Sequence, residues 1–201
     1  MSMTTIKDAL TKTLSFDEYL KLNELLVKAG STTGEHHNES YANYTRLNFS
    51  RMKRLLKTVK LTAAQTACVR ALNKSMTWLV ISEAWCGDAA QNLPVLKIIA
   101  DQNPNIELKI VLRDDNEELM EAFLTNGTKS IPKMILLDNE SLEVIATWGP
   151  RPKEAAAMVR KEKEAKGKLD DAFKQELQKW YNQDGGVAVA HDVCEMLSEL
   201  S

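Results

Sequence analysis

A short apolar run near the middle of the chain, residues 76–82, constrains the fold more than any other segment. Its sequence, Met-Thr-Trp-Leu-Val-Ile-Ser, is rich in β-forming residues and is flanked by polar ones, which is typical of a strand buried at the centre of a sheet. The apolar pattern is helical over residues 87–101, alternates as in a strand over 106–112, and is helical again over 116–125. This order of elements predicts an α/β fold that begins with parallel strands.

Two more strands are predicted after this unit, over residues 133–137 and 143–147. The segment between them, Asp138-Asn139-Glu140-Ser141, is short enough for a β-hairpin, so the two strands should be antiparallel. We therefore expect a central mixed sheet of about four strands.

Helical patterns precede and follow the predicted sheet. Ser15 and Thr62 are each followed three residues later by Glu or Gln, which is the capping-box signal of a helix start. A polar loop is expected over 30–40, where apolar residues are almost absent. Apolar spacing predicts helices over residues 15–29 and 41–59, from residue 62, over 153–181 with a break near Gly167, and over 187–200.

The chain length allows one sizeable core with additions. At 201 residues, one domain with helical extensions is more economical than two domains. We expect an N-terminal helical extension packed on the core over residues 1–61, a central domain over 62–160, and a C-terminal helical extension over 161–201.

Charge and cysteine content narrow the classes of function. The formal net charge is −2, so no positive field is available to hold a nucleic acid. No segment approaches the roughly 20 apolar residues of a membrane span, and we expect neither nucleic-acid nor membrane partners. The three cysteines, Cys68, Cys86 and Cys194, are too few and too widely spaced for a secreted disulfide framework. These features predict a cytoplasmic protein with reduced thiols.

Cys86 is the candidate reactive group. It lies in Glu83-Ala84-Trp85-Cys86-Gly87-Asp88-Ala89, directly after the predicted central strand and at the start of the next helix. Unpaired backbone N–H groups and the helix dipole at such a position favour the thiolate over the thiol. Asp88 has the opposite effect, because a nearby carboxylate opposes ionisation of the thiol. The sequence leaves the balance between these two effects open.

Three motifs in order resemble the thioredoxin family: Trp85-Cys86-Gly87, then Pro94 eight residues after the cysteine, then Ile131-Pro132 before the hairpin. Gly149 also fits, and the resemblance covers about residues 62–159. It implies a thioredoxin-like three-layer α/β fold. It also implies that the Ile131–Pro132 bond is cis, packs beside the sulfur of Cys86, and exposes backbone groups that bind an extended substrate segment.

Two positions depart from the family pattern. Ala89 stands where the resolving cysteine would be, and Val80 stands where a buried aspartate would help to ionise that cysteine. Without a second thiol, a mixed disulfide on Cys86 must be resolved by an external thiol. The preferred hypothesis is therefore monothiol thiol-disulfide exchange with protein or low-molecular-weight thiols. The alternative is a non-catalytic module that binds a peptide or partner protein in the groove between Cys86 and Pro132.

Two further enzyme classes fit less well. A peroxiredoxin-like peroxidase would have a threonine where Glu83 stands. An iron-sulfur scaffold of the monothiol glutaredoxin type would resemble Cys-Gly-Phe-Ser more closely than the Cys-Gly-Asp-Ala of this chain.

The remaining candidate residues are the neighbours of Cys86, the two other cysteines and the histidines. Trp85 is expected to be a surface-exposed aromatic beside the site, supporting partner contact or shielding the sulfur, and Gly87 and Asp88 complete the motif at the helix start. Cys68 and Cys194 lie in amphipathic helices, where a cysteine usually acts as a small buried apolar residue, a resolving role being the alternative. We expect no metal or cofactor, because the sequence offers as candidate ligands only the neighbours His36 and His37 in a polar loop and a lone His191.

Overall fold

The computed structural model describes residues 3–35 and 37–200 and has a mixed sheet of five strands in the order β1-β3-β2-β4-β5. The central strand β2 pairs in parallel with β3 and antiparallel with β4, and β4 pairs antiparallel with β5. The strands are β1 Leu14–Ser15, β2 Met76–Ser82, β3 Ile106–Leu112, β4 Lys133–Asp138 and β5 Val144–Trp148. Every residue of β2 is buried, as the continuous apolar run predicts for a central strand.

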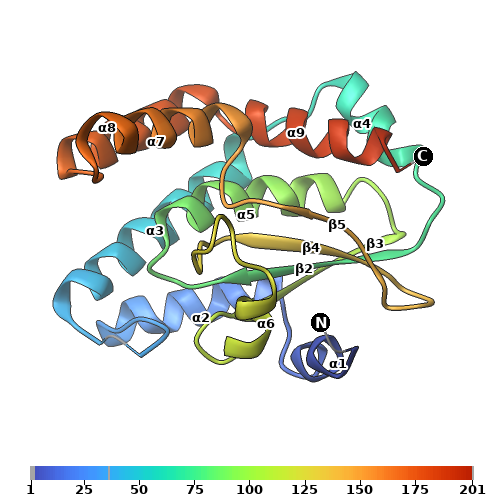
Figure 1. Cartoon of the computed structure of the whole chain (residues 1–201), viewed down its shortest axis with the longest axis horizontal. Helices are drawn as coiled ribbons and strands as arrows, with labels where there is room; N and C mark the ends of the chain where they lie inside the picture. The colour runs from blue at the N-terminus through green and yellow to red at the C-terminus, as the bar shows by residue number, and fades with distance from the viewer. Residues whose placement is uncertain (1–2, 36, 201) are drawn as a thin grey trace.

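The described part of the chain has nine helices, and those on the two faces of the sheet form three layers with it. Figure 1 shows α4, α5 and α9 over one face and α1, α2 and α6 over the other, with α7 and α8 reaching beyond the sheet above α3. The helices are α1 Met3–Leu10, α2 Phe16–Ala29, α3 Glu39–Thr58, α4 Ala63–Arg70, α5 Gly87–Ala100, α6 Glu117–Ala122, α7 Lys153–Lys166, α8 Asp171–Asp184 and α9 Val187–Ser198. The predicted mixed α/β fold with helical extensions is confirmed.

Local signals in the sequence account for several of these boundaries. Both capping boxes are formed, at Ser15 before α2 and at Thr62 before α4, so that side chains satisfy backbone N–H groups at the helix starts. The predicted break near Gly167 is present, because this residue adopts φ 70° and ends α7, a conformation that glycine adopts without steric penalty.

Two elements were not predicted from the sequence. Helix α1 lies in the expected N-terminal helical extension but corresponds to none of the individual helices predicted there, and the two-residue strand β1 adds a fifth strand to the sheet by pairing Leu14 with Ile110. Such a short strand exists through its partner, so its own sequence carries little signal.

The hydrophobic core has two parts. The main cluster joins the sheet to helices on both faces and includes fully buried Trp78, Leu79, Leu93, Ile99 and Ile110. A smaller separate cluster holds α7 and α8 together and consists of Ala155, Val159, Phe173, Leu177 and Tyr181. Among the described residues, no helix combines the length and the apolar character that a bilayer crossing needs.

Candidate functional site

Cys86 occupies the N-cap of α5, where its sulfur contacts the segment before β4. The backbone N–H of Ala89 donates to Sγ over 3.4 Å, and the thiol donates to the carbonyl oxygen of Ile131 over 3.3 Å. The Ile131–Pro132 peptide bond is cis, as the resemblance implies. The fold therefore brings Cys86 against Ile131, which lies 45 positions further along the chain, and Cys86 is only 7% exposed.

Burial decides the ionisation of Cys86. The pKa of the thiol is raised to about 12: desolvation is the largest cause and the carboxylate of Asp88 also raises it, while backbone hydrogen bonds from Ala89 and Asp88 and the charge of Arg151 act in the opposite direction. Charged groups lose solvation in a dry site, and here that loss exceeds the favourable effect of the helix N-terminus. With a pKa of about 12, only about one thiol in 10⁵ is ionised at pH 7.

Asp88 lies in the first turn of α5 and is almost completely buried, at 9% exposure. Its carboxylate pairs with the guanidinium of Arg151 over 2.6 Å and accepts a hydrogen bond from the hydroxyl of Tyr181 over 3.0 Å. Burial raises the pKa of Asp88, and the charge of Arg151 lowers it. Asp88, which the sequence places at the helix start beside the thiol, is therefore also the point where α8 and the connection between β5 and α7 attach to the site.

Trp85 is half-buried rather than exposed on the surface. Its ring meets the ring of Tyr41 edge to face, with centroids 5.3 Å apart, and the guanidinium carbon of Arg113 lies 4.9 Å from its centroid. Contacts of this kind hold an aromatic ring in a defined orientation. The expectation of a surface-exposed aromatic is not met, because α3 and the end of β3 supply neighbours that the sequence does not reveal.

Gly87 lies where α3 and α8 approach the start of α5. A Cβ at this position would come within 3.3 Å of Nε2 of Gln178 and 3.7 Å of Nη1 of Arg51. Helix α3 also fixes the segment before the cysteine, since the side-chain amide of Asn48 donates to the carbonyl oxygen of Ala84 over 2.9 Å. Both helical extensions therefore contribute to the surroundings of Cys86.

Glu83 is a buried acid that sequence reasoning treated only as a departure from another family. It is fully buried, and its carboxylate accepts a hydrogen bond from the backbone N–H of Asp114 over 3.0 Å. Desolvation raises the pKa of Glu83. The sequence offered one signal for this residue: it is an acid that directly follows a buried strand and lies three residues before the cysteine.

The positions that depart from the family pattern are filled by apolar packing. Ala89 is 1% exposed and Val80 is fully buried, so both side chains contact protein rather than solvent. Gly149 has φ 109°, and a Cβ there would collide with the carbonyl oxygen of Pro132. This glycine lets the end of β5 approach the cis-proline segment closely.

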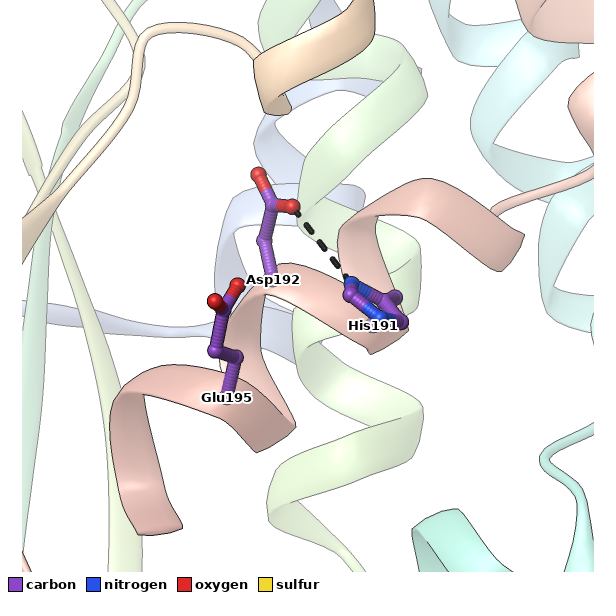
Figure 2. A group of neighbouring side chains, drawn as sticks. All are labelled: His191, Asp192 and Glu195. Atoms are coloured by element: carbon purple, nitrogen blue, oxygen red, sulfur yellow. Dashed lines mark ion pairs between the residues drawn. The ribbon is translucent and has the colours of Figure 1, made fainter. Parts of the chain in front are cut away.

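His191 is not a lone residue. One ligand atom from each of His191, Asp192 and Glu195 lies within 4.8 Å of the others, and Figure 2 shows the three side chains on one stretch of α9 with His191 and Asp192 paired. The two carboxylates already have protein partners, because Asp192 accepts from the backbone N–H of Lys153 over 2.8 Å and Glu195 pairs with the ammonium of Lys153 over 2.5 Å. The cluster thus anchors α9 to the start of α7. His37 lies in the loop before α3, and His36 lies outside the described residues.

The fold and the cis-proline beside an N-capping cysteine define a thioredoxin-fold protein. The chain belongs to the thioredoxin family, since the family model described as Thioredoxin matches residues 34–181. This range extends into both segments that we treat as extensions, and the boundaries at 62 and 160 stay a prediction. The matched range includes residues 85–89, but the match by itself does not show the specific Trp-Cys-Gly-Asp-Ala motif.

Two solved structures have a similar fold. A protein of unknown function from Pseudomonas aeruginosa has a TM-score of 0.61 and 20% identity, with 94% of this chain and 99% of that chain covered. An HIV epitope-scaffold has a TM-score of 0.58 and 20% identity, with 92% of this chain and 99% of that chain covered. No curated protein matches the chain. At this identity the likeness concerns the fold alone.

Proposed function

We propose that the protein carries out monothiol thiol-disulfide exchange through Cys86, with an external thiol completing the cycle. The observation that supports this proposal is the position of Cys86 at the start of α5. There its Sγ lies 3.3 Å from the carbonyl oxygen of Ile131, the residue before cis-Pro132. In this role Ile131 and Pro132 contact the substrate, and Trp85, Gly87 and Asp88 support the cysteine. The proposal includes a cytoplasmic location, where external thiols are abundant.

The exchange consists of two balanced steps. The thiolate of Cys86 attacks a substrate disulfide, an S–S bond forms on Cys86, and the substrate's second sulfur leaves as a thiolate. An external thiolate then attacks the mixed disulfide and restores Cys86. The chain has no local sulfur for the second step, because Ala89 occupies the resolving position.

The elevated pKa of Cys86 makes the first step slow at neutral pH. Since the thiolate is the nucleophile, a pKa of about 12 predicts a rate that rises with pH well above neutrality. The neutral thiol is also held as a donor to the carbonyl of Ile131. Reaction therefore requires proton removal from a buried group.

The same burial favours a second candidate function. In a non-catalytic module that binds a peptide or partner protein, a protonated, 7%-exposed Cys86 would serve as an apolar packing residue. In such a module no second cysteine is needed at Ala89 and no aspartate at Val80, because both buried positions serve packing.

Incubation with oxidised glutathione distinguishes the two functions. Exchange predicts a glutathione adduct on Cys86 by mass spectrometry, its removal by reduced glutathione, and no adduct at this position in the Cys86→Ser variant. If Cys86 stays unmodified at every pH at which the protein is folded, while a cell extract yields a bound partner that Cys86→Ser also retains, exchange is wrong and the binding module stands.

A further inference from the structure

A pair of thiols, Cys68 and Cys194, lies apart from Cys86, toward the other end of α5. Cys68 on α4 and Cys194 on α9 are 126 positions apart in sequence, and Figure 1 shows these two helices side by side. Each thiol donates a hydrogen bond to the backbone of the other helix. The thiol of Cys68 donates to the carbonyl oxygen of Cys194 on α9 over 3.5 Å, and the thiol of Cys194 donates to that of Gln65 on α4 over 3.8 Å. Each sulfur is therefore directed at the other helix.

The two thiols also interact with each other. Burial and, to a smaller extent, the neighbouring thiol of Cys68 together raise the pKa of Cys194 to about 12. Both residues are only half-buried, and the hydroxyl of Ser198, on the exposed side, lies 3.8 Å from Sγ of Cys68. The pair thus lies at the rim of the helix interface, where a small oxidant can reach it.

We propose that Cys68 and Cys194 form a reversible disulfide when the protein meets hydrogen peroxide, linking the C-terminal helix to α4. The thiolate of one cysteine attacks a peroxide oxygen, so that an S–O bond forms, the O–O bond breaks and hydroxide leaves. The second thiolate attacks that sulfur, the S–S bond forms and a second hydroxide leaves. The sulfurs lose two electrons, the peroxide is reduced, and the two thiol protons complete two water molecules.

This pair cannot serve Cys86 within the folded chain. Cys86 caps the N-terminus of α5, whereas the residues after α5 hold α4, because the amide of Asn103 donates to the carbonyls of Val69 and Leu72. The 14 residues of α5 span about 21 Å, so the pair and Cys86 lie near opposite ends of this helix. The proposed disulfide is therefore independent of the function proposed for Cys86.

The disulfide would close a long loop. A bridge between residues 126 positions apart restricts the unfolded chain, which predicts an increase of about 10 °C in the melting temperature of the oxidised protein. It would also hold α9, whose Asp192 binds the backbone of Lys153 at the start of α7. Amide exchange in α4 and α9 should slow on oxidation.

The test uses the Cys86→Ser variant, in which the pair supplies every remaining thiol. The variant is treated with hydrogen peroxide, blocked with N-ethylmaleimide, digested and analysed by mass spectrometry, beside a sample reduced with dithiothreitol. We expect a linked peptide containing Cys68 and Cys194, lighter by two hydrogens than the reduced pair, with both thiols recovered on reduction. The wild-type protein, mapped in the same way, gives an answer that does not depend on the folding of the variant.

Controls separate the pair from other oxidation. Cys194→Ser should abolish the linked peptide and the increase in melting temperature, whereas Ser198→Ala should retain both, because it removes only the neighbouring hydroxyl. Two alkylated thiols after peroxide treatment would overturn the proposal. Sulfinic acid on either residue, or a disulfide between two chains in place of the internal one, would overturn it as well.

Discussion

Replacing Asp88 by asparagine should make Cys86 more acidic and the protein less stable. The carboxylate opposes ionisation of Cys86, second only to burial, and it neutralises the guanidinium of Arg151 over 2.6 Å. The Asp88→Asn substitution removes the charge and keeps the side-chain size. The two effects have opposite consequences for reactivity and stability, so they can be measured separately.

The expected magnitudes follow from the charges. A unit charge at about 6 Å and an effective dielectric constant of about 20 contributes roughly 2.8 kcal/mol, or about two pKa units. Allowing for solvent screening, we expect the pKa of Cys86 to fall by about one to two units, which increases the thiolate population at neutral pH about 10- to 100-fold. Leaving Arg151 without its partner should destabilise the fold by about 3 kcal/mol, or about 6–12 °C in melting temperature.

The assay is the rate of iodoacetamide modification of Cys86 against pH. It is run with Cys68 and Cys194 replaced by serine, so that one thiol reports. The pH dependence gives the pKa, and the limiting rate at high pH reports access, so a site opened by the substitution is distinguished from a more acidic thiol. Thermal unfolding followed by circular dichroism gives the stability.

The matched control is Tyr181→Phe. This change deletes one hydroxyl donor to Asp88 and keeps both charges, so it should destabilise the fold by about 1.5–3 kcal/mol and change the pKa of Cys86 much less. If Asp88→Asn lowers the pKa of Cys86 no further than Tyr181→Phe does, the carboxylate is not the second cause of the elevated pKa. An unchanged melting temperature would likewise refute the ion-pair argument.

Three further predictions concern backbone, packing and pH. Gly149→Ala should destabilise the protein by at least ~2 kcal/mol in urea unfolding, because its φ is 109° and its Cβ would meet the carbonyl of Pro132; an unchanged midpoint would contradict this. Phe173→Ala should loosen the small cluster of α7 and α8. We expect alkylation of Cys86 to become faster while the melting temperature of the main core changes little. If alkylation of Cys86 becomes faster only to the extent that the whole protein is destabilised, the cluster unfolds only together with the rest of the protein. Burial raises the pKa of Glu83, so the folded state binds its proton more tightly than the unfolded state. Its contribution to stability is complete below about pH 4.3 and is lost as pH rises through the folded pKa; Glu83→Gln should reduce this slope in urea midpoints measured across pH.

The sequence predicts the central elements of the fold well, because their signals are local. The bounds of β2 and β3, Met76–Ser82 and Ile106–Leu112, coincide with the predicted strands, since both segments combine β-forming residues with polar flanks. Capping boxes located the starts of α2 and α4 for the same reason. Strand β1 could not be found in this way, because it exists only through its pairing with β3.

The candidate site was only partly predictable. The contact between Cys86 and the Ile131–Pro132 segment followed from the resemblance, whereas the contact of Asp88 with Tyr181 joins residues 93 positions apart. No spacing rule connects such residues. The sequence therefore indicated the opposing effects of the helix dipole and the Asp88 carboxylate on the pKa of Cys86, but not the desolvation, which is the largest effect. The neighbouring thiols of Cys68 and Cys194 were missed for the same reason.

The surroundings of Cys86 are used for packing more than for acidifying a thiol. A dithiol site needs room and charge for a second sulfur, and here the methyl group of Ala89 is buried while its N–H contacts Sγ of Cys86. The one charged side chain in the first turn of α5, Asp88, binds Arg151 and Tyr181 from the C-terminal part of the chain. Because the carboxylate of Asp88 both raises the pKa of the thiol and binds the hydroxyl of Tyr181 on α8, the acidity of Cys86 is linked to the packing of α8.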